Sequence, residues 1–166
     1  MPMKLRIEPS ALNSVYLPHL LGNQHRYQIF FGGSSSGKSV FLATRAALDC
    51  MQGRNILVLR NVARTLRGSC WNEIYKAITR MGLTAYFAIS KADMTITCTL
   101  NGAQILFAGL DDVEKIKSIT PQSGPLTDIW IEEATETAYE DYKQLDKRLR
   151  GASKHVKRLT LSFNPV

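Results

Sequence analysis

The stretch that decides the fold of this chain reads Gly32-Gly33-Ser34-Ser35-Ser36-Gly37-Lys38-Ser39. It fits the pattern G-x-x-x-x-G-K-[ST] of a phosphate-binding P-loop. An apolar run over residues 27–31 comes before it, and a helical pattern over residues 40–48 follows it. Because strand, glycine loop and helix is the order in which this motif works, it is favoured over a chance glycine- and serine-rich turn.

Each position of the loop has a physical use. Glycines let successive backbone N–H groups point at phosphate oxygens, and the helix that begins at the loop adds the positive end of its dipole. We predict that Lys38 reaches the β- and γ-phosphates of a nucleotide, where it is catalytic, and that the Ser39 hydroxyl binds Mg²⁺. The predicted nucleotide-binding residues of the loop are Gly32, Gly33, Ser34, Ser35, Ser36, Gly37, Lys38 and Ser39.

A second apolar run ends in two adjacent carboxylates, Glu132 and Glu133. In open α/β sheets, ligands bind at the carboxyl ends of the strands. We therefore predict that Glu132 holds Mg²⁺, directly or through water, and that Glu133 is the catalytic residue that polarises the attacking water. The alternative is that Glu133 and Glu136 only favour the start of a helix. The P-loop supports the first interpretation, and the absence of a guanine-selecting N-K-x-D sequence favours ATP.

Size and composition set the broad class. A chain of 166 residues suits one domain, and no apolar run reaches the 18 residues of a membrane span. Three widely spaced cysteines without metal-ligand spacing indicate reduced, buried thiols in a cytoplasm.

The net charge of +7 comes largely from two basic clusters. Their members are Arg45, Arg54, Arg60, Arg64, Arg67, Lys76 and Arg80 in one stretch and Lys143, Lys147, Arg148, Arg150, Lys154, Lys157 and Arg158 in the other. Contact with a nucleic-acid backbone and a solvated helix face are both open explanations of these charges.

Periodicity predicts an alternation of strands and helices. Strands are expected at 27–31, 55–60, 85–90, 94–100, 103–108, 127–131 and 156–163, and helices at 10–17, from the P-loop to 51, 65–81, 112–118 and 138–150. Ser10 is the expected cap of the first helix, and Pro18 its expected boundary. Asn101-Gly102 predicts a hairpin. The fold class is therefore α/β, with a mainly parallel central sheet and a β-hairpin insertion.

Five segments of the chain, in order and spacing, resemble bacteriophage terminase large subunits. They are residues 26–39 (Walker A), 59–69 (an arginine-bearing segment), 109–118 (a loop before Walker B), 129–136 (Walker B) and 161–165 (the coupling motif). The resemblance implies an ASCE-type (RecA-like) P-loop ATPase over residues 1–166, with residues 1–25 as a lead-in segment. It implies an ATP- and Mg²⁺-dependent motor that packages double-stranded DNA into a procapsid in the infected bacterial cytoplasm. The implied partners are the portal protein and a small terminase subunit, with several copies of the motor in a ring.

The resemblance also suggests site residues outside the P-loop. It implies that Tyr27 and Gln28 contact adenine, although ordinary strand residues are an equal alternative. It implies that Asn164 senses the γ-phosphate, where the alternative is a plain turn before proline. Where many relatives carry an arginine in the P-loop, this chain has Ser34 or Ser35. The candidates to supply that positive charge are Arg60, Arg64 and Arg67, or Lys115 and Lys117 from a neighbouring subunit.

The family also carries a C-terminal nuclease domain, whereas this sequence ends at Val166, just after the coupling motif. We therefore expect an ATPase domain without DNA cleavage, as a fragment or as one piece of a split protein. Two other functions stay open. One is a nucleotide-gated DNA-binding or assembly module that hydrolyses little alone. The other is a metabolic P-loop kinase, which the absence of a recognisable acceptor motif disfavours.

Overall fold

A seven-stranded sheet forms the centre of the molecule, with the strand order β1-β7-β6-β2-β5-β4-β3. The computed structural model describes residues 3–165. The first five strands of this order (β1, β7, β6, β2 and β5) are parallel to one another. β4 and β3 extend the sheet with antiparallel pairing. The strands are β1 (Tyr27–Phe31), β2 (Ile56–Arg60), β3 (Phe87–Ser90), β4 (Thr95–Cys98), β5 (Gln104–Gly109), β6 (Asp128–Glu132) and β7 (Arg158–Phe163).

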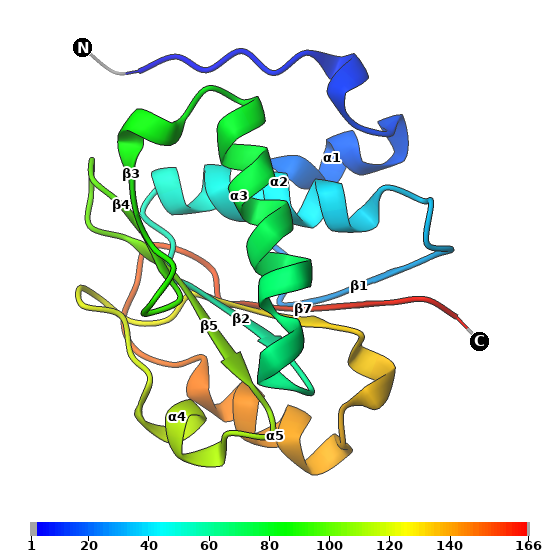
Figure 1. The fold of residues 1–166 in the computed structure, drawn as a ribbon, viewed down its shortest axis with the longest axis vertical. Helices are drawn as coiled ribbons and strands as arrows, with labels where there is room; N and C mark the ends of the chain where they lie inside the picture. Colours follow the sequence, from blue (N-terminus) through cyan, green and yellow to red (C-terminus); the bar gives the residue numbers. More distant parts are fainter. Residues whose placement is uncertain (1–2, 166) are drawn as a thin grey trace.

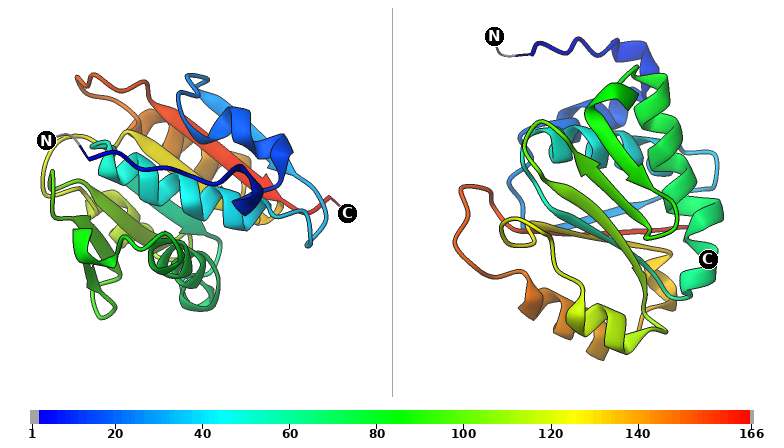
Figure 2. Two further views of the ribbon diagram at one scale, coloured as in Figure 1. Left: turned by 90° about the horizontal axis from the view of Figure 1, so that it is seen from above. Right: turned by 60° about the vertical axis from the view of Figure 1, so that its left-hand side comes forward.

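Helices cover both faces of the sheet (Figures 1 and 2). On one face lie α1 (Leu17–Leu20), α2 (Lys38–Met51) and α3 (Asn72–Arg80), and on the other lie α4 (Val113–Ser118) and α5 (Tyr139–Arg148). Short turns of 3-10 helix occupy Pro9–Ala11, Ser14–Tyr16, Ala63–Thr65, Thr84–Tyr86 and Ala134–Glu136. Within residues 3–165, no helix has the length and apolar character needed to cross a membrane. The predicted α/β class with a mainly parallel sheet is confirmed.

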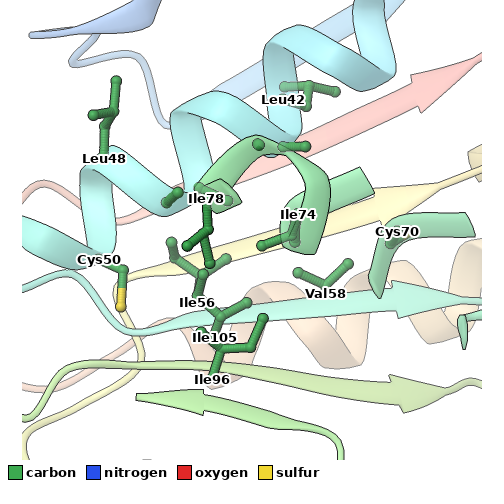
Figure 3. Close-up of a cluster of buried hydrophobic side chains, with 14 of the residues drawn as sticks. Leu42, Leu48, Cys50, Ile56, Val58, Cys70, Ile74, Ile78, Ile96 and Ile105 are labelled. Atoms are coloured by element: carbon green, nitrogen blue, oxygen red, sulfur yellow. The ribbon is translucent and has the colours of Figure 1, made fainter. Parts of the chain in front are cut away.

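The sequence of β2 is apolar throughout, without an alternation of apolar and polar residues, because both faces of the strand are covered. Ile56 and Val58 belong to the core beneath α2 and α3, and Leu57 and Leu59 belong to the core beneath α4 and α5. A central parallel strand covered on both faces has no position for a polar side chain. Figure 3 shows Ile74 and Ile78 of α3 directed toward β2, where they complete the first core.

The antiparallel end of the sheet confirms the predicted hairpin. Thr97 of β4 pairs with Gln104 of β5, and the turn between these strands contains Asn101 and Gly102. The Gly102 backbone has a φ of 78°, a left-handed conformation that glycine adopts without steric cost.

The structure corrects the predicted helix at residues 10–17. This segment forms two 3-10 turns, and α1 begins only at Leu17. The side chain of Asn13, not Ser10, accepts a hydrogen bond from the Val15 N–H at 3.3 Å. Pro18, the expected boundary of the helix at 10–17, instead lies inside the first turn of α1. A proline is tolerated there because the backbone N–H groups of the first turn make no hydrogen bond within the helix.

The predicted helix at 65–81 is interrupted at its start by a π turn, Arg67–Trp71, before α3 begins. The Trp71 N–H donates to the Leu66 carbonyl, five residues back, at 3.0 Å. The extra residue in this turn places Cys70 and Trp71 together in the core. All three cysteines are free and buried, as predicted.

Neither explanation left open for the basic clusters, nucleic-acid contact or a solvated helix face, holds for three of the arginines, because these three side chains are buried. Arg45, Arg54 and Arg158 are at most 5% exposed. Arg158 binds Asp128 at 2.6 Å and also pairs with Asp49, while Arg54 binds Asp128 at 3.0 Å. These side chains form a network at the end of the sheet where β6 and β7 begin, opposite the P-loop edge.

Burial governs the titration of this network. Desolvation raises the pKa of Asp49 to about 6, against the attraction of Arg158. Desolvation and the neighbouring Arg158 charge lower the pKa of Arg45 to about 10. Arg45 donates to Thr160 at 2.9 Å and to Gln28 at 2.6 Å, so its charge is satisfied inside the protein.

Gly109, the last residue of β5, allows a close approach of the chain after β2. A Cβ there would lie 2.6 Å from the Cα of Ala63 and would also collide with the Ala63 nitrogen and the Asp111 carboxylate. We expect Gly109→Ala to lower the free energy of unfolding by about 1–3 kcal/mol, because backbone must move to admit the methyl group. Urea titration measures this change.

Gly68→Ala is the matched control, because nothing lies within 4 Å of a Cβ at Gly68. This variant should be unchanged or more stable by roughly 0.5–1 kcal/mol, the usual gain of alanine over glycine in helical backbone. Equal stabilities of the two variants would contradict the close approach at Gly109.

Candidate active site

The order of the strands brings the predicted site residues to one edge of the sheet. β1 leads into the P-loop and β6 leads into the Glu132–Glu133 pair, with β7 between them. In Figure 1 the loop after β1 and the chain after β7 lie at the same side of the molecule. The carboxyl ends of these parallel strands therefore form the edge at which α/β proteins bind ligands.

The P-loop turns between β1 and α2 in the form that its glycines permit. The Ser36 N–H donates to the Gly33 carbonyl at 3.0 Å, and Gly37 has a φ of 79°. α2 then begins at Lys38, so its first N–H groups face the loop. The Ser36 hydroxyl oxygen is buried and has no hydrogen-bond partner within residues 3–165. An oxygen-rich ligand in the loop would satisfy this group.

Lys38 connects the P-loop with the chain that follows β7. Its side chain is buried, and Nζ donates to the carbonyls of Gly32 at 3.0 Å and Gly33 at 3.4 Å. Nζ also donates to Oδ1 of Asn164. The cation thus rests on three neutral acceptors, which phosphate oxygens can replace with stronger, charge-assisted hydrogen bonds. The structure places Asn164 beside Lys38, where the resemblance implies a γ-phosphate sensor.

Glu132, the last residue of β6, is buried. Its Oε2 accepts a hydrogen bond from the Cys70 thiol, with an Sγ–Oε2 distance of 2.8 Å, and lies 4.0 Å from Nε of Arg60. Burial, together with the Glu132 charge, raises the pKa of Cys70 well above its usual range, so this thiol stays protonated as a donor. Sequence reasoning missed Cys70 as a site residue, because it lies 62 positions from Glu132.

Glu133 has an unusual backbone for a residue that is not glycine. Its φ and ψ are 54° and 49°, in the left-handed region, and its side chain is half-buried. It precedes the 3-10 turn Ala134–Glu136 but makes no capping hydrogen bond to it. Such strain persists where the surrounding structure holds it and is common at active sites. The structure thus gives no capping role to the Glu133 carboxylate, and its catalytic role stays a prediction.

The two predicted adenine contacts, Tyr27 and Gln28, both line a cavity of about 350 Å³ beside β1, but their side chains lie on opposite faces of the strand. The Gln28 side chain is buried, accepts from Asn23 at 3.0 Å and from Arg45 at 2.6 Å, and donates to the His25 carbonyl at 2.8 Å. These bonds favour the alternative, a structural strand residue. Tyr27 points to the opposite face of β1, is exposed, and donates to Asp146 at 3.1 Å. An adenine contact by Tyr27 stays a prediction.

The candidate arginines separate into two places. Arg60, at the end of β2, lies at the site beside Glu132. Arg64, Arg67 and Lys115 line a surface cavity of about 220 Å³ between the segment after β2 and β5. Lys117 pairs with Glu114 at 3.4 Å on α4. Of these side chains, Arg60 alone contacts a predicted site residue in the described part of the chain.

The residues at this edge fit Mg²⁺. Ser39 stands in the first turn of α2 and offers a hydroxyl, and Glu132 offers a carboxylate, both oxygen donors that this ion prefers. Residues 3–165 contain no cluster of three His, Cys, Asp or Glu side chains that could hold a metal alone. Few protein ligands are usual for Mg²⁺ in nucleotide sites, where phosphates and water complete the shell.

Comparison with known proteins identifies the family. The family model described as "Phage terminase large subunit" matches residues 24–166. The chain belongs to the phage terminase large subunit family. It is 32% identical over 140 residues to the PBSX phage terminase large subunit of Bacillus subtilis (strain 168), covering 84% of this chain and 31% of that protein. It is 32% identical over 138 residues to the large subunit of Bacillus phage SPP1, covering 78% of this chain and 33% of the relative.

The fold of this terminase also matches solved large terminases. The large terminase of a thermophilic bacteriophage superposes with a TM-score of 0.65 at 17% identity, over 83% of this chain and 34% of that one. The large terminase of the same thermophilic phage has been solved in complex with ATP-gamma-S. The RecA-like ATPase fold implied by the resemblance is confirmed. The chain spans about a third of the length of the curated relatives that it matches.

Proposed function

We propose that this terminase chain is the ATPase domain of a motor that packages double-stranded DNA into a phage procapsid in the cytoplasm of an infected bacterium. The observation that carries the proposal is the convergence of Lys38, Asn164 and Glu132 on one sheet edge next to an intact P-loop. Family membership and the ATP-gamma-S complex of the thermophilic phage terminase support nucleotide binding here.

The residues divide the work of hydrolysis as follows. Backbone N–H groups of residues 32–39 and Nζ of Lys38 bind the phosphates, and Glu132 and Ser39 would hold Mg²⁺. The bound ion would neutralise charge on the phosphates. Glu133, half-buried beside Glu132, accepts a proton from the attacking water. Loss of the γ-phosphate changes the partners of Lys38, and Asn164 passes this change to the chain after β7.

The partners of the motor belong to the same proposal. A structure titled "The Phi-28 gp11 DNA packaging Motor" superposes with a TM-score of 0.55 at 14% identity. We propose double-stranded DNA, the portal protein, a small terminase subunit and further copies of this chain as partners. With three arginines buried, phosphate contacts fall to exposed cations such as Arg64, Arg67 and Arg150.

One observation favours a second candidate, a nucleotide-gated DNA-binding or assembly module with little hydrolysis alone. The P-loop, residues 32–39, carries no arginine, and Arg60 at this edge pairs with the Glu132 carboxylate at 4.0 Å, so the positive charge needed at the transition state would come from outside the chain. A neighbouring subunit would then supply it.

The test measures ATP hydrolysis and MgATP binding by the purified chain, with and without linear double-stranded DNA. We expect MgATP binding, and turnover that DNA raises and that falls as salt is added, because DNA contacts release counterions. Lys38→Ala is the control and should lose phosphate-dependent binding. Binding without DNA-stimulated turnover would favour the second candidate, and absence of MgATP binding would overturn both.

A further inference from the structure

The π turn at Arg67–Trp71 lies directly against the predicted metal ligand. Turns of this kind are uncommon and often occur next to functional sites. Here the turn directs Cys70 into the core, where the residue is 0% exposed. Trp71, also buried, packs edge-on against Phe107 of β5 with a centroid distance of 5.1 Å. The backbone that carries the Cys70 thiol is therefore fixed on the sheet.

The two neighbours of the Glu132 carboxylate act on the same oxygen. Cys70 Sγ lies 2.8 Å from Oε2, and Arg60 Nε lies 4.0 Å from it. Among residues 3–165, no side chain or N–H group donates a hydrogen bond to Oε1 of Glu132. One oxygen is thus held by the protein and the other is left for a metal ion or its water shell.

A glutamate that binds a metal ion with one carboxylate oxygen benefits from a hydrogen bond that fixes the other oxygen. Its side chain has one more rotatable bond than aspartate, and fixing that bond costs conformational entropy. Arg60 is too far from Oε2 for a hydrogen bond, so the thiol makes the short contact. A thiol is a weak donor to neutral acceptors, but a charged acceptor strengthens the hydrogen bond.

We propose that Cys70 is a positioning residue that holds Oε2 of Glu132 and so presents Oε1 for Mg²⁺. The proposal rests on the proposed function, because it assigns Glu132 to the metal. Groups that orient a metal ligand typically contribute about 10- to 100-fold in metal affinity. We expect a loss of about that size when Cys70 cannot donate.

The first measurement detects the hydrogen bond between Cys70 and Glu132 by infrared spectroscopy. The S–H stretching band of the free protein is recorded for the wild type and for Cys70→Ala, Cys98→Ala and Glu132→Gln. We expect a component at low frequency that Cys70→Ala removes, Glu132→Gln shifts upward, and Cys98→Ala leaves in place. Cys98 is the matched control because it is also free and fully buried. A Cys70 component that does not respond to Glu132→Gln would overturn the proposal.

The second measurement reads the consequence. Mn²⁺ affinity is measured in the presence of ADP, and ADP affinity is measured separately in EDTA. Cys70→Ala should weaken Mn²⁺ binding about 10- to 100-fold with the ADP affinity in EDTA unchanged. Cys70→Ser keeps a donor and should restore most of the loss, and Cys98→Ala should resemble the wild type. Wild-type Mn²⁺ affinity in a folded Cys70→Ala protein would overturn the proposal.

The two measurements separate this proposal from the function on which it rests. A wild-type protein that binds no Mn²⁺ with ADP would overturn the proposed function and the metal-positioning role together. The infrared band would still report whether the Cys70–Glu132 contact exists. Thermal unfolding of each variant identifies a loss caused by misfolding. If Cys70→Ala does not fold, the response of the Cys70 S–H band to Glu132→Gln, which leaves the thiol in place, decides the outcome.

Discussion

Replacing Glu133 by Gln should lower the rate of ATP hydrolysis by about 10²- to 10⁴-fold, the usual contribution of a positioned general base. The amide has nearly the shape of the carboxylate but cannot accept a proton from water. Because Lys38 and the P-loop are untouched, the affinity for MgATP should stay close to that of the wild type. Single-turnover hydrolysis and equilibrium binding of a fluorescent ATP analogue measure the two quantities separately.

Glu136→Gln provides the matched control for this variant. Glu136 is an exposed carboxylate at the other end of the same 3-10 turn, three residues along the chain. Its loss should leave hydrolysis unchanged. A similar, small effect of both substitutions would mean that these glutamates only favour the turn electrostatically, which is the alternative to catalysis.

Replacing Arg158 by Met should cost about 3–5 kcal/mol of folding free energy, as expected when one partner of a buried ion pair is removed. The side chain is 1% exposed and binds both Asp49 and Asp128. Methionine fills much of the volume but leaves two buried carboxylates facing fewer positive charges. Urea unfolding at neutral pH measures the loss, and Arg150→Met, at an exposed arginine, should change stability by no more than about 0.5 kcal/mol.

The cost of Arg158→Met should depend on pH with a defined sign. Burial already raises the pKa of Asp49 to about 6 in the folded protein, and removal of Arg158 raises it further. A carboxyl whose pKa is higher in the folded than in the unfolded protein binds more protons in the native state. The free energy of unfolding therefore rises as the pH falls toward the unfolded pKa. The difference between wild type and variant should therefore shrink as the pH is lowered from neutral through the folded pKa. A constant difference would place the cost in packing instead.

The P-loop and the acidic pair were predictable because each is a short, local pattern beside an apolar strand. The residues that complete the site come from distant parts of the chain. Lys38 and Asn164 are 126 positions apart, and only the family resemblance linked them. The Cys70–Glu132 contact depends on a π turn that helical periodicity does not reveal, since the apolar spacing of residues 65–81 fits a continuous helix.

The sequence of the basic clusters does not reveal which of their cations are buried. In sequence, Arg158 is one of several cations in a row, and nothing nearby marks it as buried. Its partner Asp49 lies 109 positions away on α2, and the two meet only when β7 inserts between β1 and β6. Charge counts therefore overestimated the surface available to nucleic acid, because pairing across the sheet is a property of topology rather than of local composition.

The left-handed backbone of Glu133 has a consequence for laboratory evolution. Most residues with a Cβ lose roughly 1–2 kcal/mol in that conformation. Glycine has no Cβ and adopts it freely, and asparagine tolerates it better than most because its short side chain can hydrogen-bond locally. A library ranked by heat resistance alone would therefore enrich Glu133→Gly and Glu133→Asn. Each of these variants would lose the predicted general base while it removes backbone strain. Selection for a thermostable variant of this chain must therefore also measure the release of phosphate from ATP.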